Sequence, residues 1–140
     1  MFKATKLISE ELDRREINYD IEEGENASML VVGFAIENGP SVRVGFISAD
    51  DDNSVAIRII GLVRNIHDTK LDQVLNVVNN CNKKYRYVKF TLNEKNMNVE
   101  FDMPKFTPDN AVGPVAVEML VRMMQIVETA YPEIMRAIWM

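Results

Sequence analysis

The segment from Met97 to Met103 constrains the fold more than any other part of the chain. It reads MNVEFDM, and its residues alternate strictly between apolar and polar side chains. Successive side chains of a β-strand point to opposite faces, so this alternation is typical of a strand with one face buried and the other in water. The segment therefore predicts a sheet with one face on an apolar core.

Four further segments indicate strands that join this sheet. The segment 28–37 is apolar on both faces, whereas 41–48 and 54–62 place most of their apolar residues on one face. The segment 87–93 leads into the alternating strand. Short connections at Asn38-Gly39-Pro40 and Asp50–Asn53 favour antiparallel neighbours. The inward residues expected in these segments are Val42, Val44, Phe46, Val55, Ile57, Ile59, Val88, Phe90 and Leu92.

Three segments indicate helices. Residues 5–17 form an amphipathic pattern, a second helix is expected to begin near Asp68 or Thr69, and a long apolar helix starts at 111–114. Pro132 lies inside the third pattern and is expected to kink or split it. The buried stripe expected on the second helix is Leu71, Val74, Leu75, Val78 and Cys81.

The order of these elements is α-β-β-β-α-β-β-α, which predicts an α+β fold. We expect residues 1–140 to form a single domain, in which helices pack on a single antiparallel five-stranded sheet.

Composition limits the classes of protein to which the chain can belong. With 16 basic and 21 acidic residues the net charge is −5, which argues against a dedicated nucleic-acid binder. Cys81 is the only cysteine, so the chain cannot form an internal disulfide. We find no secretory signal and no uninterrupted run of about 18 apolar residues, the length that a membrane-spanning helix needs. We therefore predict a cytoplasmic protein with no membrane contact.

The residue types that carry catalysis or bind metals form no recognisable pattern. His67 is the only histidine, and no Gly-x-Ser-x-Gly sequence presents a nucleophile. The acidic turn 50–53 lacks the central Gly and terminal Glu of a calcium loop, and the scattered glycines form no phosphate-binding motif. We expect no catalytic residue, no cofactor and no metal.

The stretch NNCNKKYRYVKF, residues 79–90, interleaves cations with aromatics as single-stranded nucleic-acid binders do. We interpret it instead as the end of the second helix followed by the start of a strand. Nucleic-acid binding through 83–89 remains an alternative.

The long third helix is unusually rich in methionine. Five of the nine methionines lie beyond residue 115, beside Trp139, and the apolar arc is wider than one sheet face normally covers. The surplus is either core, since Met fills irregular gaps, or a second surface that a twin subunit or a peptide covers. The five are Met119, Met123, Met124, Met135 and Met140.

The segment VNNCNKKYRYVKFTLNEKNMNVEFDMP resembles the YbjN family of bacterial sensory transduction regulators, as does the later segment AYPEIMRAI. The resemblance implies a fold similar to the type III secretion chaperones, which are small, acidic, commonly dimeric and non-catalytic. It supplies no catalytic or cofactor-binding residue. The matching residues are Asn79, Asn82, Tyr87, Lys89, Phe90, Asp102 and Pro104.

Our hypothesis is a non-enzymatic regulatory or chaperone-like protein that binds a partner polypeptide as a homodimer. The alternative is a small-molecule sensor or an enzyme with a pocket between sheet and helices. The expected partner-binding residues are three cations on one sheet face and five apolar residues of the last helix: Arg43, Arg58, Lys89, Met119, Met123, Met124, Met135 and Trp139.

Overall fold

A computed structural model describes residues 2–37, 39–49, 54–104 and 108–140. Three α-helices, one 3-10 turn and six strands make up the described part of the chain. In chain order they are α1 (Lys3–Arg14), β1 (Asp20–Glu23), β2 (Ala27–Ala35), β3 (Ser41–Ala49), β4 (Val55–Val63), η1 (Asp68–Lys70), α2 (Leu71–Lys84), β5 (Lys89–Asn93), β6 (Asn96–Met103) and α3 (Asp109–Trp139). The predicted α+β class with an antiparallel sheet is confirmed.

The strands form one antiparallel sheet in the order β1-β2-β3-β4-β6-β5. The prediction of five strands was wrong, because β1 adds a sixth at the edge. Its sequence is DIEE and all four residues are exposed, so it lacks the alternation by which a half-buried strand is recognised.

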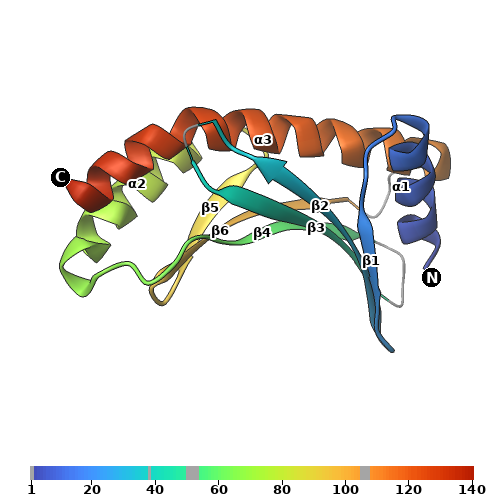
Figure 1. Ribbon diagram of the computed structural model, residues 1–140, viewed down its shortest axis with the longest axis horizontal. Helices are drawn as coiled ribbons and strands as arrows, with labels where there is room; N and C mark the ends of the chain where they lie inside the picture. The colour runs from blue at the N-terminus through green and yellow to red at the C-terminus, as the bar shows by residue number, and fades with distance from the viewer. Residues whose placement is uncertain (1, 38, 50–53, 105–107) are drawn as a thin grey trace.

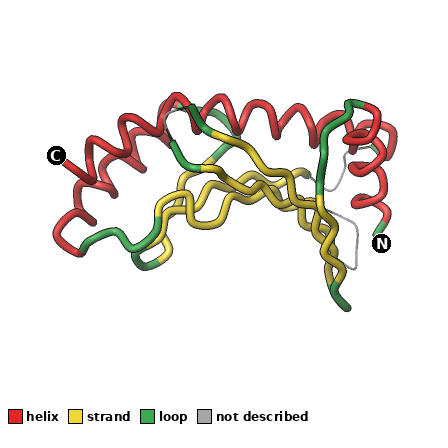
Figure 2. Tube along the Cα trace, viewed as in Figure 1, coloured by secondary structure: helices red, strands yellow, loops and turns green. Residues whose placement is uncertain are grey.

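All three helices lie on the same face of the sheet (Figures 1 and 2). α3 runs across the sheet, α1 packs beside its beginning and α2 beside its end. Most apolar residues predicted to point inward lie in the core that these helices cover, including Val44, Phe46, Ile57 and Val99.

Three local predictions differ from the structure. The strand expected from Tyr87 begins at Lys89, because Tyr87 has a positive φ of 70° that no strand residue adopts. Leu75 is 51% exposed rather than part of the buried stripe of α2. α3 continues through Pro132 without splitting. Pro132 has no N–H to donate to the carbonyl of Glu128, but both residues are exposed, so water can bind that carbonyl instead.

The stretch 79–90 is the end of α2 followed by the start of β5, as predicted. The second helical segment begins with η1, whose cap is His67 rather than Asp68 or Thr69. Asn38 and the acidic turn 50–53 lie outside the described residues.

By length and composition, α3 is apolar enough to cross a membrane. Core helices of soluble proteins meet the same criterion, and half of the most apolar 18-residue stretch of α3 is buried within this chain. Its apolar character therefore follows largely from its place in the core.

Candidate functional site

The sheet face opposite the helices is the first candidate site, and we call it the open face. No helix of the described residues lies on it (Figures 1 and 2). β2, β3 and β4 and the residue that follows β4 line a shallow hollow at its centre: Met29, Val31, Arg43, Gly45, Ile47, Arg58, Ile60 and Arg64.

The strand register places the three predicted cations together on this face. Gly45 pairs with Arg58, Arg58 pairs with Glu100, and Glu100 pairs with Lys89. Arg43 lies two residues before Gly45 and therefore shares its face. The prediction that Arg43, Arg58 and Lys89 share one face is confirmed.

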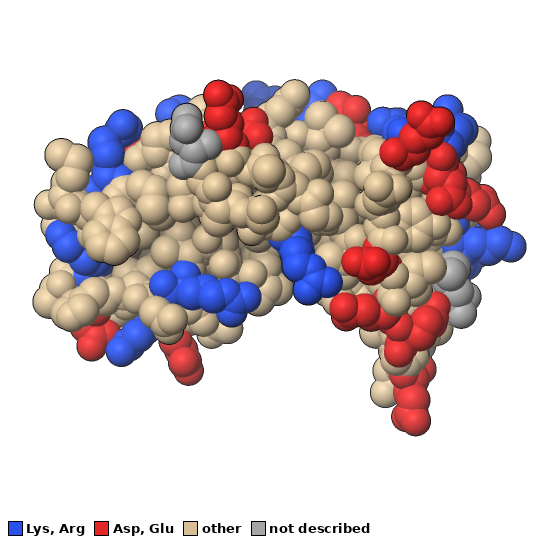
Figure 3. Space-filling model, viewed as in Figure 1, with Lys and Arg blue, Asp and Glu red and all other residues tan. Residues whose placement is uncertain are grey.

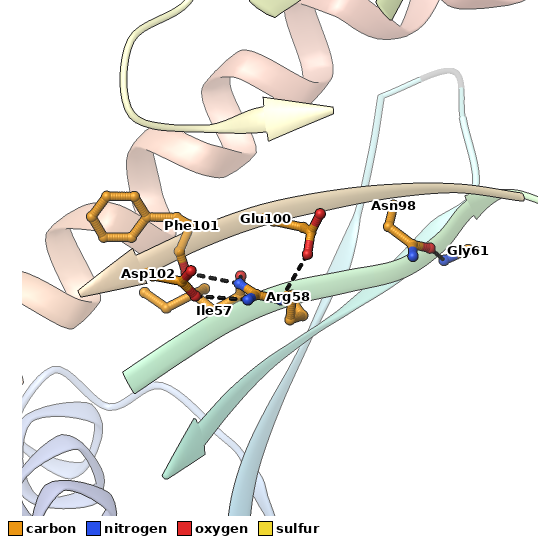
Figure 4. A network of polar contacts seen from close by, with 7 residues as sticks. All are labelled: Ile57, Arg58, Gly61, Asn98, Glu100, Phe101 and Asp102. Atoms are coloured by element: carbon orange, nitrogen blue, oxygen red, sulfur yellow. Dashed lines mark hydrogen bonds and ion pairs between the residues drawn. The ribbon is translucent and has the colours of Figure 1, made fainter. Parts of the chain in front are cut away.

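Arg58 is held by other residues of the open face (Figure 4). Its Nε lies 3.1 Å from Glu100 Oε1 and its Nη2 lies 2.7 Å from Asp102 Oδ1. Its Nη1 donates to the carbonyl oxygens of Ile57 and Phe101, both at 3.0 Å. With its hydrogen bonds satisfied inside the sheet, Arg58 ties β4 to β6 and is not a free cation for a partner.

The other cations of this face are held less tightly. Arg43 Nη2 lies 3.6 Å from Glu22 Oε1, and Lys89 Nζ is 3.4 Å from the carbonyl of Asn82. Arg64 makes only a 3.4 Å contact to the carbonyl of Ile60 and forms no ion pair with any residue that the structure describes. Arg43, Arg64 and Lys89 are therefore more available to a ligand than Arg58, and Arg43 and Arg64 are the two of them that line the hollow.

The methionines of α3 are distributed differently from the prediction of a contact surface. Met119, Met123 and Met124 are buried in the core, because they lie on the side of α3 that faces the other elements of the fold. In this conformation they offer little surface to a partner. Met135 is half-buried and Trp139 is 79% exposed.

Met135 and Trp139 belong instead to a second candidate site, which we call the end cavity. It has a volume of about 700 Å³ and lies between the segment that joins β4 to α2 and the last turns of α3. α3 supplies an apolar wall of Tyr131, Met135, Ile138 and Trp139. The opposite side carries Arg64, Asn65, His67, Thr69 and Lys70.

The backbone on the polar side of the end cavity is hydrogen-bonded to the turn between β5 and β6. The Asn65 N–H donates to Asn96 Oδ1 at 3.1 Å, and the Ile66 N–H donates to the carbonyl of Lys95 at 2.8 Å. Our reading of the sequence missed this run of polar residues, whose only signal is the segment RNIHDTK directly after an apolar strand.

The described residues hold no group of three or more His, Cys, Asp or Glu side chains that could bind a metal. Cys81 is buried, and its burial, reinforced by the nearby charge of Glu133, raises the pKa of the thiol. A thiol with a raised pKa forms little of the reactive thiolate. Cys81 is therefore a core residue rather than a nucleophile.

Comparison with models of protein families gives a match over most of the chain. The model of the YbjN family, described as "Putative bacterial sensory transduction regulator", matches residues 5–134. A search of curated proteins found no match.

Proposed function

The chain belongs to the YbjN family, and from this premise we propose that it is a non-enzymatic regulatory protein that binds a partner polypeptide on its open face. The description of the family as a regulator supports the regulatory role. The polypeptide partner is our own proposal, and the chemistry of the open face supports it.

The observation that carries the proposal is the apolar centre of the open face. Ile60 is 59% exposed there, and the half-buried Met29 and Ile47 line the same hollow. Exposed apolar residues surrounded by polar ones are typical of protein-binding surfaces. β2 is also apolar on both faces, which is typical of strands that are covered on both.

The charges around this centre indicate which polypeptide would fit. Arg43 and Arg64 flank the hollow with weakly held guanidinium groups. A guanidinium binds a carboxylate through paired hydrogen bonds. The partner that fits is a segment with apolar side chains flanked by Asp or Glu, the apolar side chains lying on Ile60.

Site-specific photo-crosslinking in cells tests the proposal. A photoreactive amino acid replaces Ile60 in one variant and Leu75 in the other. Leu75 is the matched control, because it is similarly exposed but lies on α2. We expect the Ile60 position to capture a polypeptide that the Leu75 position does not.

The captured polypeptide is then purified, and its affinity is measured by isothermal titration calorimetry. We expect Ile60→Asp to weaken binding at least about tenfold, since a charge would replace a buried contact, and Leu75→Asp to leave it unchanged. Equal capture at both positions, or an affinity that Ile60→Asp does not alter, would contradict the proposal.

The homodimer, the chaperone-like fold and the cytoplasmic location remain predictions. Light scattering of the full chain over a wide concentration range measures the first of them. If Ile60 crosslinks two copies of this chain, and Ile60→Asp converts a dimer to a monomer, the open face is a dimer interface and the polypeptide-partner proposal is wrong.

A further inference from the structure

We propose that the end cavity binds a small organic anion with an apolar or aromatic body, such as an aryl-alkyl carboxylate. This inference does not depend on a polypeptide partner for the open face. It rests on the size of the end cavity, the apolar wall from α3 and the charges that converge opposite that wall.

The size and wall of the end cavity suit a small apolar body. Its volume of about 700 Å³ falls within the range of roughly 300–1,000 Å³ that is usual for small-molecule sites. Tyr131, Met135 and Ile138 form the wall, and Trp139 stands at its edge with most of its indole in water. A flat or linear apolar group in the cavity would cover that indole.

The charge of the end cavity is opposite in sign to that of the whole chain. Among the residues that line it are Arg64 and Lys70 but no Asp or Glu, although the chain has five more acids than bases. The nearest acid in sequence, Asp68, lies outside the lining and pairs with Lys95 Nζ at 3.2 Å.

Arg64 and Lys70 form no ion pair with the residues that the structure describes. In Figure 3 the acidic side chains gather mainly over α1 and the β1–β2 hairpin, at the end of the molecule away from η1 and the C-terminus. The end cavity therefore contains two available cations and lies away from most of the negative charge of the molecule. Both features favour an anionic ligand.

His67 contributes a hydrogen-bond donor. Its Nδ1 accepts from the Thr69 N–H at 3.2 Å, so Nε2 carries a hydrogen. A donor at Nε2 and the amide of Asn65 complement carboxylate oxygens, which only accept. The polar side is thus suited to an anion rather than to a cation.

Arg64 owes its place to the backbone at Gly61. Gly61 has a φ of +69° and its N–H donates to Asn98 Oδ1 at 2.9 Å. A Cβ at Gly61 would lie 2.6 Å from Arg64 Cζ, so only glycine lets the guanidinium pack there.

Fluorescence titration of the full chain tests the inference, because Trp139 is the only tryptophan and stands at the edge of the cavity. The probes are 4-phenylbutyrate, octanoate and phenyl phosphate, with 4-phenylbutan-1-ol as the neutral counterpart of the first. We expect at least one anion to shift Trp139 emission saturably with a Kd below about 1 mM, and the alcohol to bind at least about tenfold more weakly.

Variants separate the end cavity from other surfaces. We expect Arg64→Gln and Lys70→Gln each to weaken anion binding about tenfold. Lys83→Gln, which removes a cation outside the cavity, is expected to leave it unchanged. Circular dichroism confirms that each variant is folded.

Three outcomes would overturn the inference. They are the absence of a saturable shift with all three anions, equal affinity for the alcohol, and unchanged affinity in both Arg64→Gln and Lys70→Gln. Arg64 lines both the end cavity and the hollow of the open face, whereas Lys70 and Trp139 line the end cavity and not that hollow. The Trp139 signal and the Lys70→Gln variant therefore test the end cavity independently of the crosslinking at Ile60.

Discussion

Ile59 and Ile60 are adjacent in β4 and identical in chemistry, yet one is 1% exposed and the other 59% exposed. Ile59 points to the helix-covered face, where α3 and its neighbours exclude water. Ile60 points to the open face, where no described residue covers it fully. The same side chain therefore stabilises the fold at one position and is available for binding at the next.

The largest effect expected from this comparison is on the free energy of unfolding of alanine variants. Ile59→Ala removes buried methyl groups and leaves a cavity, so we expect a loss of about 2–5 kcal/mol. Ile60→Ala removes groups that are largely in water, and we expect a change of about 0.5 kcal/mol or less. Urea denaturation measures both, and equal losses would mean that Ile60 is buried in solution.

Two glycines extend the comparison to the backbone. A Cβ at Gly113 of α3 would lie 2.7 Å from the carbonyl oxygen of Leu7, where α1 crosses, whereas a Cβ at Gly33 on β2 would meet nothing within 4 Å. We expect Gly113→Ala to destabilise the fold by about 1–3 kcal/mol, although alanine normally stabilises a helix interior by about 1 kcal/mol.

Gly33→Ala is the matched control for Gly113→Ala. We expect it to be neutral or to stabilise slightly, because glycine weakens a strand by roughly 0.5–1 kcal/mol relative to alanine. Thermal unfolding of both variants decides the point. A stabilised Gly113→Ala protein would show that α1 does not pack closely against α3.

A smaller effect is expected from the ion pairs of the open face. Arg58→Ala leaves Glu100 and Asp102 without their shared cation, and we expect a loss of about 1 kcal/mol that shrinks as salt rises. Arg43→Ala, which breaks only the longer contact with Glu22, should cost less. Urea denaturation at low and high NaCl measures the difference, and equal effects would contradict the geometry of Figure 4.

The last prediction concerns a charge cluster on the helical layer. Hydrogen bonds from Arg14 and Arg15 hold the pKa of Glu11 below its ordinary value of 4.5. The unfolded chain therefore takes up the proton more readily, so the contribution of Glu11 to stability is present above the ordinary pKa and is lost as the pH falls through the lowered one.

We accordingly expect Glu11→Gln to lower stability at neutral pH and to flatten its decline in acid. Glu10→Gln is the control. It also removes one acid from α1, but Glu10 forms no ion pair with the described residues. Thermal unfolding from pH 7 to pH 3 measures both variants, and parallel curves for Glu11→Gln and the unmodified chain would show that the cluster does not form.

Much of the sheet could be predicted from sequence because local alternation reports how each strand divides its side chains between core and water. Val42, Val44 and Phe46 are buried as that pattern predicts. β1 could not be recognised in this way, because it pairs only along one edge of β2 and buries nothing. Leu75 has the spacing of a buried residue, but α2 lies at the end of the layer and leaves it exposed.

The candidate sites were less accessible to sequence reasoning. Alternation placed Arg43, Arg58 and Lys89 on one face, but it could not show that Arg58 is already bound by Glu100 and Asp102. In the end cavity, Arg64 and Lys70 lie in one small site with residues of α3 that follow them by more than sixty positions in the sequence. No local pattern carries that information.

The α+β class, most strands and the core side of each could be predicted from the sequence, because these depend on periodicities within single elements. Three features emerge only in the folded molecule: all three helices cover the same face, three α3 methionines are core residues, and Ile60 is left exposed. Which surface covers which is set by packing between elements far apart in the chain, and the spacing of residues within one element does not encode it.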